Sequence, residues 1–452
     1  MEKNLTTGSV FKTVVYFSLP YLLSYFLQTL YGMADLFIIG QFRGVASTTA
    51  VAIGSQVMHM LTVMIVGLAM GATVMIGRAV GGMDHRGAAR AVGNTVTLFM
   101  ALSVVLTAAL LASVGPIVRA MSTPPEAAAG AAAYLAICFA GVPFITAYNI
   151  ISSIFRGMGD SKSPMYFVAV ACAANVGLDY LFIGGFGMDA EGAALATTLS
   201  QAVSVAVALA VVRRRKTQIR PARADFRPER KTMAGLLKIG VPVSLQDGFI
   251  QIAFIVITVI ANRRGLNDAA AVGIVEKIIS VLFLVPSSML SAVSALSAQN
   301  FGAGKPERAR LTLKYAAAIA VGWGVAATAA MQLYADGAVA LFSDAAAVIT
   351  LGGQYMRGYV WDCIFAGIHF CFSGYFCARG LSVVSFIHNS LSMACVRVPL
   401  SYLASVYFPY TLFPMGLASP AGSVFSAAIC AGVYLWLERR ERRSGDLSAH
   451  IG

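Results

Sequence analysis

Long apolar stretches separated by short polar segments dominate the hydrophobic pattern of this 452-residue chain. An α-helix needs about 20 mostly apolar residues to cross a bilayer. Twelve stretches of this kind begin near Phe11, Val45, Ala89, Ala127, Pro164, Gly192, Met233, Ala270, Ala309, Gly352, Val383 and Thr411. The pattern therefore predicts an all-α integral membrane protein with twelve transmembrane helices.

The second half of the chain repeats the first. Leu19-Pro20 is matched by Val241-Pro242, and the run from Ala50 to Ile53 is matched by the run from Ala271 to Ile274, at an offset of 221 or 222 residues. An even number of spans per copy gives both copies the same orientation, with a symmetry axis along the membrane normal. We expect two pseudo-symmetric six-helix lobes, residues 1–212 and 233–438, with a basic cytoplasmic linker at 213–232 and a basic cytoplasmic tail at 439–452.

Composition supports lipid as the solvent of this chain. Hydrophobic residues make up 58% and charged residues 12%, and mean hydropathy is +0.75, whereas soluble domains carry about 25% charged residues. The net charge of +13 comes from Lys and Arg in alternate short loops and near both ends. That bias predicts cytoplasmic termini and argues against a nucleic-acid partner. The seven cysteines lie in apolar runs, which predicts packing residues and no disulfide or metal site.

Sequence motifs of soluble enzymes are absent. There is no G-x-x-x-x-G-K-[ST] loop, because Pro306 follows Gly302-Ala303-Gly304-Lys305, and there is no H-E-x-x-H pair. His59, His369 and His388 are dispersed over different spans. We therefore expect no enzymatic activity, no cofactor and no ATP-driven transport by this chain alone.

Acidic residues inside the apolar spans are the strongest functional signal. A carboxylate near the bilayer centre costs at least about 2.5 kcal/mol, so it usually faces a cavity and has a role. Ser24, Gln28, Tyr31 and Asp35 follow the helical spacing of one polar stripe in the first span. Pro20 precedes them and removes a backbone hydrogen bond, which predicts a hinge.

A second acid lies in the fifth span. Asp179 follows Asn175 by four residues, so both share a helix face. Thr197 in the sixth span and Tyr134 in the fourth add hydroxyl groups. If the six helices close into a bundle, these groups and Asp35 line one cavity, where two nearby carboxylates would load and release a proton. Otherwise, Asn175 forms only an interhelical hydrogen bond.

The second half carries its own polar set, with a second hinge at Pro242. Its members are Gln246, Asp247, Glu276, Tyr359, Asp362 and His369. Lys277 adjoins Glu276, and Arg397 in the eleventh span would neutralise one of these acids. A structural ion pair and an ion site are equally compatible with these residues.

Several of these features together resemble the multidrug and toxic compound extrusion (MATE) family, in particular its bacterial DinF-like and NorM-like members. The matching segments are Leu19-Pro20 with Asp35 and Gly40, Gly81-Gly82-Met83-Asp84, Arg156-Gly157-Met158-Gly159-Asp160-Ser161-Lys162-Ser163-Pro164, Asn175 with Asp179 and Gly184, and Gln299-Asn300-Phe301-Gly302-Ala303-Gly304-Lys305. Their order, spacing and duplication span nearly the whole chain.

The resemblance implies a V-shaped pair of lobes in the bacterial inner (plasma) membrane, acting as a monomer. It implies export of drugs or metabolites in exchange for H⁺ or Na⁺. The family's first-half site matches Asp35, Asn175, Asp179, Thr197 and Tyr134, which places a coupling Na⁺, if Na⁺ is used, at Asp35 and Asp179. Pro20 matches the family's bending proline. The second half departs from NorM-like members, because Ile250 stands where they carry a Glu.

We therefore predict a secondary antiporter for amphipathic, often cationic compounds. One alternative is a lipid-linked oligosaccharide flippase of the same superfamily, which would favour Arg and Lys in its cavity for phosphate groups. The other alternative is an intramembrane enzyme, which needs a clustered nucleophile or acid–base set.

Overall fold

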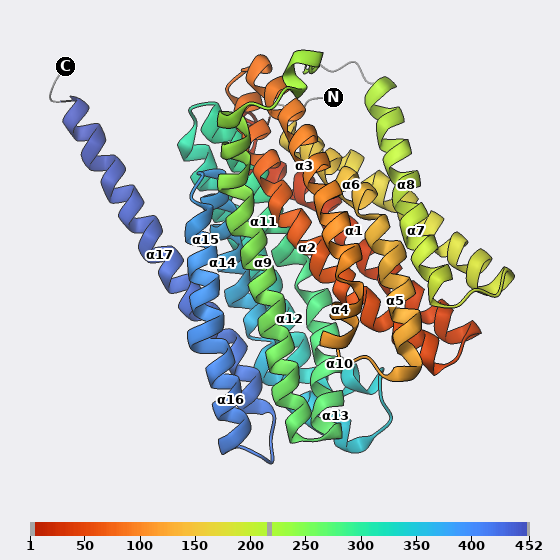
Figure 1. Ribbon diagram of the computed structural model, residues 1–452. Coiled ribbons are helices and arrows are strands. Elements are labelled where there is room, and N and C mark those ends of the chain that lie inside the picture. The colour runs from red at the N-terminus through yellow and green to blue at the C-terminus, as the bar shows by residue number, and fades with distance from the viewer. Residues whose placement is uncertain (1–4, 215–218, 450–452) are drawn as a thin grey trace. The chain divides into compact units, whose positions relative to one another are not determined.

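The computed structural model describes residues 5–214 and 219–449, with side chains described up to residue 441 (Figure 1). Parts of the expected linker (215–218) and tail (450–452) lie outside the described residues. The described chain is helical and contains no strand. It forms two compact units. Unit 1 holds Met1–Gly248, Ser294–Thr312 and Cys377–Gly380, and unit 2 holds Phe249–Val293, Leu313–Phe376 and Leu381–Gly452.

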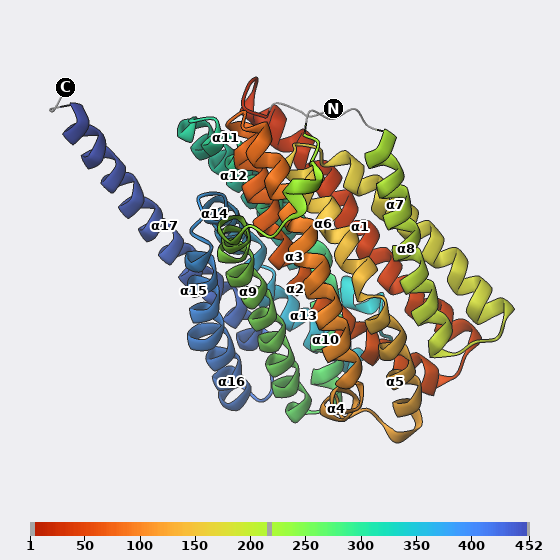
Figure 2. The same ribbon diagram turned by 45° about the horizontal axis from the view of Figure 1, so that its top comes forward.

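Unit 1 contains the first six spans. Its helices are α1 (Val10–Phe42), α2 (Val45–Gly81), α3 (His85–Ala112), α4 (Val114–Ala120), α5 (Pro125–Ala140), α6 (Val142–Gly157), α7 (Lys162–Asp179), the π-helix η1 (Tyr180–Gly185), α8 (Ala190–Arg214) and the 3₁₀-helix η2 (Arg223–Phe226). α1 packs on α7, α7 on α8, and α2 on both α5 and α6 (Figure 2).

Three further helices are divided between the two units, a fourth has only its last two residues in unit 1, and the rest belong to unit 2. The shared helices are α9 (Arg230–Arg264), α11 (Leu284–Gly302) and α12 (Pro306–Ala340). Unit 2 also has α10 (Leu266–Leu282), α13 (Ala346–Tyr359), α14 (Asp362–Ala378, whose last two residues lie in unit 1), α15 (Ser382–Ser392), the π-helix η3 (Met393–Arg397), α16 (Val398–Tyr407) and α17 (Phe413–Ala449). Within unit 2, α13 packs on α10 and α17.

The described residues contain up to twelve candidate spans, in agreement with the hydrophobic pattern, but three of them are broken. Within this part of the chain, nine helices are long and apolar enough to cross a membrane, and three bent helix pairs bring the number to twelve if each pair is one span. The pairs are α5 with α6 (48°), α10 with α11 (40°) and α13 with α14 (43°). Pro143 lies in the first turn of α6, where its missing N–H and fixed φ favour a new helix start. The stretches expected at Ala127, Ala270 and Gly352 are therefore not single helices.

Glycines let the first part of α9 lie directly against α2 in unit 1. A Cβ atom on Gly71 would stand 2.2 Å from the Leu236 carbonyl oxygen, and a Cβ on Gly240 would stand 2.2 Å from the Leu68 carbonyl oxygen. Gly67 and Gly71 form a small-xxx-small motif that permits such close backbone contact. This contact explains why unit 1 extends to Gly248. The units group residues by proximity, so the repeat-based lobe boundaries stay a prediction.

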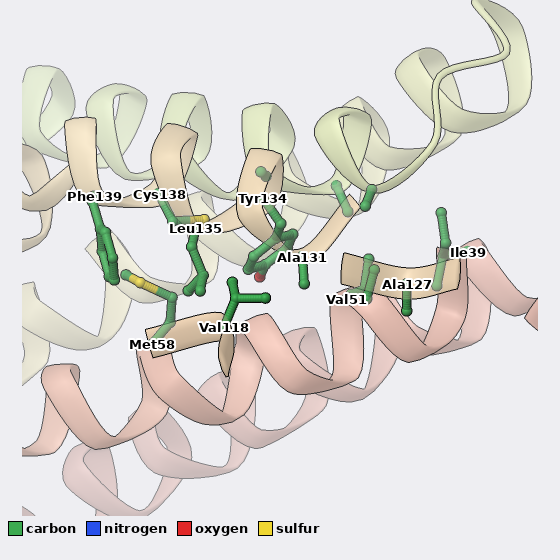
Figure 3. Packing of buried hydrophobic residues seen from close by; sticks show 14 of the residues in the cluster. Ile39, Val51, Met58, Val118, Ala127, Ala131, Tyr134, Leu135, Cys138 and Phe139 are labelled. Carbon is green, nitrogen blue, oxygen red and sulfur yellow. The ribbon is translucent and has the colours of Figure 1, made fainter. Parts of the chain in front are cut away.

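One hydrophobic core cluster of unit 1 is built from α1, α2, α4, α5, α6, η1 and α8, and Figure 3 shows part of it. Tyr134 lies flat against α2, and a Cβ atom on Gly54 would stand 2.2 Å from its ring. Val51 and Leu135 are fully buried in the same cluster. Gly54 therefore provides the space that fixes the position of Tyr134.

The cysteines agree with the sequence prediction at six of seven positions. None of the seven forms a disulfide, and six are buried. Cys395 is exposed, so the expectation of a packing residue is wrong there. It lies in η3, where the wider π-helical turn changes which side chains point inward.

Candidate functional site

α1, α7 and α8 bring together four of the polar residues singled out in the first half of the sequence. Asp35 lies on α1, Asn175 and Asp179 on α7, and Thr197 on α8. Asp35 is 3% exposed, Asn175 1% and Asp179 0%. The helix faces inferred from the four-residue spacings thus point into the same bundle.

The Asp35 carboxyl group is the centre of this cluster. Thr197 Oγ1 donates a hydrogen bond to Asp35 Oδ2 at 3.2 Å. The side chains of Asp179 and Asn175 lie next to the same carboxyl group. In the described chain, Asp35 Oδ1, both carboxyl oxygens of Asp179 and both amide atoms of Asn175 have no hydrogen-bond partner.

Unpartnered buried polar atoms are costly, and buried carboxylates are more costly still. Two such acids side by side also repel each other if both are ionised. A proton shared by the pair or a bound cation removes both penalties. The cluster supplies carboxylate, amide and hydroxyl oxygens, which are ligands that hard cations prefer. The site of Asp35 and Asp179 is therefore suited to a proton or Na⁺.

A π-helix follows the acidic cluster directly. α7 ends at Asp179, and η1 begins at Tyr180. Such turns are rare and occur frequently at functional sites. The sequence analysis missed η1, because the apolar run continues through it without a break.

The remaining first-half candidates lie around this cluster without bonding to it. The Tyr134 hydroxyl is 3.1 Å from Ser55 Oγ on α2. Tyr31 and Gln28 are half-buried on α1, and Tyr31 is close enough to Asp35 to interact with its charge. Within the described residues, none of these three side chains hydrogen-bonds to Asp35 or Asp179.

Both expected hinge prolines lie inside long helices. α1 continues through Pro20, and Ser24 Oγ donates to the Pro20 carbonyl oxygen at 2.7 Å. α9 continues through Pro242. Their role as hinges stays a prediction.

The second-half set contains a buried ion pair. Arg397 of η3 donates to the Asp362 carboxylate at the start of α14, and both side chains are buried. Arg397 also donates to the Ser419 carbonyl oxygen at 3.4 Å, and its guanidinium lies 5.9 Å from the Tyr359 ring centroid. Arg397 thus neutralises one of the predicted acids.

Other members of this set are placed differently from the expectation. Asp247 and Gln246 lie on the part of α9 that belongs to unit 1, although the sequence repeat assigns them to the second half. They face α2, since a Cβ atom on Gly67 would stand 2.6 Å from Asp247 Oδ2. Glu276 forms no ion pair with Lys277 in the described chain, and its Oε1 lacks a hydrogen-bond partner.

His369 has a partner that the sequence analysis did not single out as a site residue. His369 Nε2 is 3.3 Å from Ser423 Oγ, and its ring centroid is 5.7 Å from that of His388. His388 lies 3.0 Å from Ser373 Oγ and 3.3 Å from Ser426 Oγ. Each histidine occupies its own span, so only the packed structure reveals the pair.

Comparison with protein families supports the internal repeat. The MatE family model matches the chain twice, at residues 20–181 and 242–403. The two matches are displaced by 222 residues at both ends, which is the offset found within the sequence. The same offset places Asn175-Val176-Gly177-Leu178-Asp179 opposite Arg397-Val398-Pro399-Leu400-Ser401.

Relatives match over almost their whole length. "Probable multidrug resistance protein YpnP" of Bacillus subtilis is 28% identical over 428 residues, which is 95% of this chain and 95% of the relative. "Probable multidrug resistance protein NorM" of Thermotoga maritima is 23% identical over 423 residues, covering 92% and 90%. A solved structure of a multidrug resistance MATE family transporter in an outward-facing conformation aligns with a TM-score of 0.89 at 25% identity, covering 96% and 97%.

Proposed function

The chain belongs to the MatE family, and we propose that it is a multidrug efflux antiporter that exchanges amphipathic, often cationic compounds for H⁺ or Na⁺. The observation that carries the coupling is the buried pair of Asp35 and Asp179, whose oxygens have no partner among the described residues apart from the hydrogen bond from Thr197. The names of the relatives, multidrug resistance proteins, support the substrate class.

Exchange follows because the coupling ion and the exported compound compete for this site. In one state the protein takes up a compound from the cytoplasm. In the other, an ion from outside binds Asp35 and Asp179, neutralises the pair and favours release of the compound. Pro20 is the point where α1 bends as the ion binds, because the helix lacks one backbone hydrogen bond there. The coupling ion shifts the equilibrium only by its difference in affinity for the two states.

We place this antiporter in the bacterial inner membrane with both termini in the cytoplasm, acting as a monomer on small molecules. The loop charges support this orientation. The relatives are named for resistance and export, which favours a transporter over an enzyme.

Transport by the purified protein in proteoliposomes tests the proposal. Ethidium efflux is measured under an imposed proton gradient and, separately, under a sodium gradient. We expect one gradient to drive efflux and Asp35→Asn to reduce it to the rate of empty vesicles. Glu126→Gln, at an exposed carboxylate of the same unit, is the control and should transport normally. Folded wild-type protein that exports nothing under either gradient would favour the lipid-linked oligosaccharide flippase.

A further inference from the structure

Arg156 is a buried cation without an acidic partner. Its place in the sequence, beside a short polar loop, is typical of a cytoplasmic loop charge. The structure instead places it in the last turn of α6 and 9% exposed. Within the described part of the chain, no carboxylate forms an ion pair with it, and its Nε has no hydrogen-bond partner. A buried charge left in this state is costly and usually has a role.

Hydroxyl groups without partners share the α6 face of Arg156. Tyr148, Ser152 and Arg156 are spaced by four residues and therefore lie along one side of the helix. Tyr148 and Ser152 are buried, at 6% and 1% exposure. Neither the Tyr148 hydroxyl nor the Ser152 hydroxyl has a hydrogen-bond partner among the described residues. Three potential donors thus gather on this face.

Aromatic rings from α1 complete the surroundings. The Arg156 guanidinium lies 4.6 Å from the Tyr21 ring centroid, in cation–π contact. Tyr25 and Tyr148 are also near enough to interact with its charge. This contact leaves the charge uncompensated, since a ring supplies no anionic oxygen.

We propose that Tyr148, Ser152 and Arg156, with Tyr21 beside the guanidinium, form a subsite for the anionic group of an amphiphile. A carboxylate or phosphate group has several acceptor oxygens and makes charge-assisted hydrogen bonds with a guanidinium. Its oxygens would also accept hydrogen bonds from the two hydroxyl groups. The cluster thus matches an anion in both charge and hydrogen bonding.

The subsite lies at the end of unit 1 that holds the N-terminal segment. Gln299 Nε2 donates to the Gly157 carbonyl oxygen, next to Arg156, and Gln299 Oε1 accepts from the Leu5 N–H. Under the proposed orientation, this end faces the cytoplasm. The subsite would therefore meet an anionic group on the side from which compounds are taken up.

The subsite refines the substrate class and in this respect rests on the proposed function. Arg156 contacts Tyr21, and Asp35 lies 14 residues, or about 21 Å, further along α1, so the subsite and the acidic pair lie at different depths of unit 1. An elongated zwitterionic amphiphile, with charges about 20 Å apart, would place its cation toward the acids and its acidic group at Arg156. A phospholipid headgroup carries the same kind of anionic group and is the second candidate ligand for this subsite.

Equilibrium binding tests the subsite without requiring transport. The probes are a rhodamine with a free carboxylate and the ethyl ester of the same dye, measured by fluorescence anisotropy with purified protein in neutral detergent. We expect Arg156→Gln to weaken binding of the carboxylate dye by about tenfold or more, as for loss of hydrogen bonds to a charged group, and to leave the ester unchanged. Arg156→Lys should lose less affinity for the carboxylate dye. Arg119→Gln, at an exposed arginine, should keep the wild-type affinity.

The paired variant Tyr148→Phe/Ser152→Ala keeps the charge and should selectively weaken binding of the carboxylate dye, so the test does not depend on Arg156→Gln folding.

Nanodiscs with and without phosphatidylglycerol distinguish a transported amphiphile from a lipid headgroup as the ligand of the subsite. If lipid headgroups occupy the subsite, phosphatidylglycerol weakens binding of the carboxylate dye to wild-type protein but not to Arg156→Gln. Equal effects of Arg156→Gln on both dyes, no effect on either, or no carboxylate binding by wild-type protein would overturn the inference. Intact binding without gradient-driven efflux would instead refute the antiport.

Discussion

The Asp35 carboxyl group has one oxygen that accepts a hydrogen bond from Thr197 and one that accepts none. This asymmetry leaves a free acceptor in a buried site, next to Asp179 and Asn175. At the residue scale, the proposed antiport therefore depends on which cation or proton completes the hydrogen bonding of two acids.

Replacing Thr197 separates the two coupling ions, because its hydroxyl would affect them in opposite directions. If Na⁺ is the ion, Thr197→Val removes an oxygen ligand, and the half-saturating Na⁺ concentration should rise by about tenfold or more. If H⁺ is the ion, the lost hydrogen bond no longer stabilises the Asp35 carboxylate, and half-maximal efflux should move to higher pH. Efflux is measured across Na⁺ concentration and pH. Thr197→Ser keeps the hydroxyl and should behave as wild type. If Thr197→Val has the same Na⁺ and pH dependence of efflux as wild type, Thr197 does not contribute to ion binding.

Gly54 should be essential to the position of Tyr134. A Cβ atom at this position would stand 2.2 Å from the ring, so Gly54→Ala forces the ring or α2 to move at a cost of about 1–3 kcal/mol. The matched control Gly322→Ala, at a helical glycine with nothing within 4 Å, should be neutral or slightly stabilising. Thermal unfolding in detergent measures both variants. Equal melting temperatures for the two would mean that Tyr134 is not held by this contact.

At the element scale, irregular helices recur in two corresponding pairs of spans, whereas the break between α10 and α11 has no counterpart in the continuous helix α2. The fifth span contains η1 and the eleventh contains η3, and the broken pairs α5–α6 and α13–α14 are the fourth and tenth spans. Asp179 adjoins one π-helix, and Arg397 lies in the other. The same local distortion thus accompanies an acidic cluster in unit 1 and an ion pair in unit 2.

Loss of one partner of the Asp362–Arg397 ion pair should destabilise unit 2 more than loss of both partners. Arg397→Leu leaves a buried carboxylate without its partner, which costs about 3–5 kcal/mol. The double variant Arg397→Leu/Asp362→Leu removes both charges and should recover most of this loss. Unfolding temperatures in detergent report the comparison. A double variant as unstable as the single one would show that the charges do not compensate each other.

Sequence patterns predict helices better than they predict contacts. Hydrophobic run length gave all twelve spans, and four-residue spacing placed Asn175 and Asp179 on the face that meets Asp35. The breaks, π-helices and the His369–His388 pair escaped prediction because apolar composition continues through them and partners lie on different spans. Arg156 escaped because a charge near a loop is indistinguishable, in one dimension, from one folded back into the bundle.

At the scale of the whole molecule, the two family matches, displaced by 222 residues, indicate an internal repeat whose two copies carry different polar residues. Asn175 and Asp179 of the first copy correspond to Arg397 and Ser401 of the second. The first copy therefore has two buried acids side by side, while the second has an arginine beside Asp362. This difference leads us to assign coupling to unit 1.

Single cysteines test the orientation of the whole chain. In a background where the native cysteines are replaced, Asp344→Cys and Arg220→Cys occupy exposed positions. The proposed orientation predicts that a membrane-impermeant maleimide labels Asp344→Cys in intact cells and Arg220→Cys only after permeabilisation. The reverse labelling pattern would invert the topology.

The central claim is that Asp35 and Asp179 hold the coupling ion in competition with the exported compound. The most direct measurement is the affinity of purified protein for ethidium across a range of pH and Na⁺ concentrations, in wild type and in Asp35→Asn/Asp179→Asn. We predict that wild-type affinity falls as the coupling ion rises, and that the double variant binds ethidium independently of that ion. A double variant with the same ion dependence as wild type would contradict the account and place coupling outside this pair.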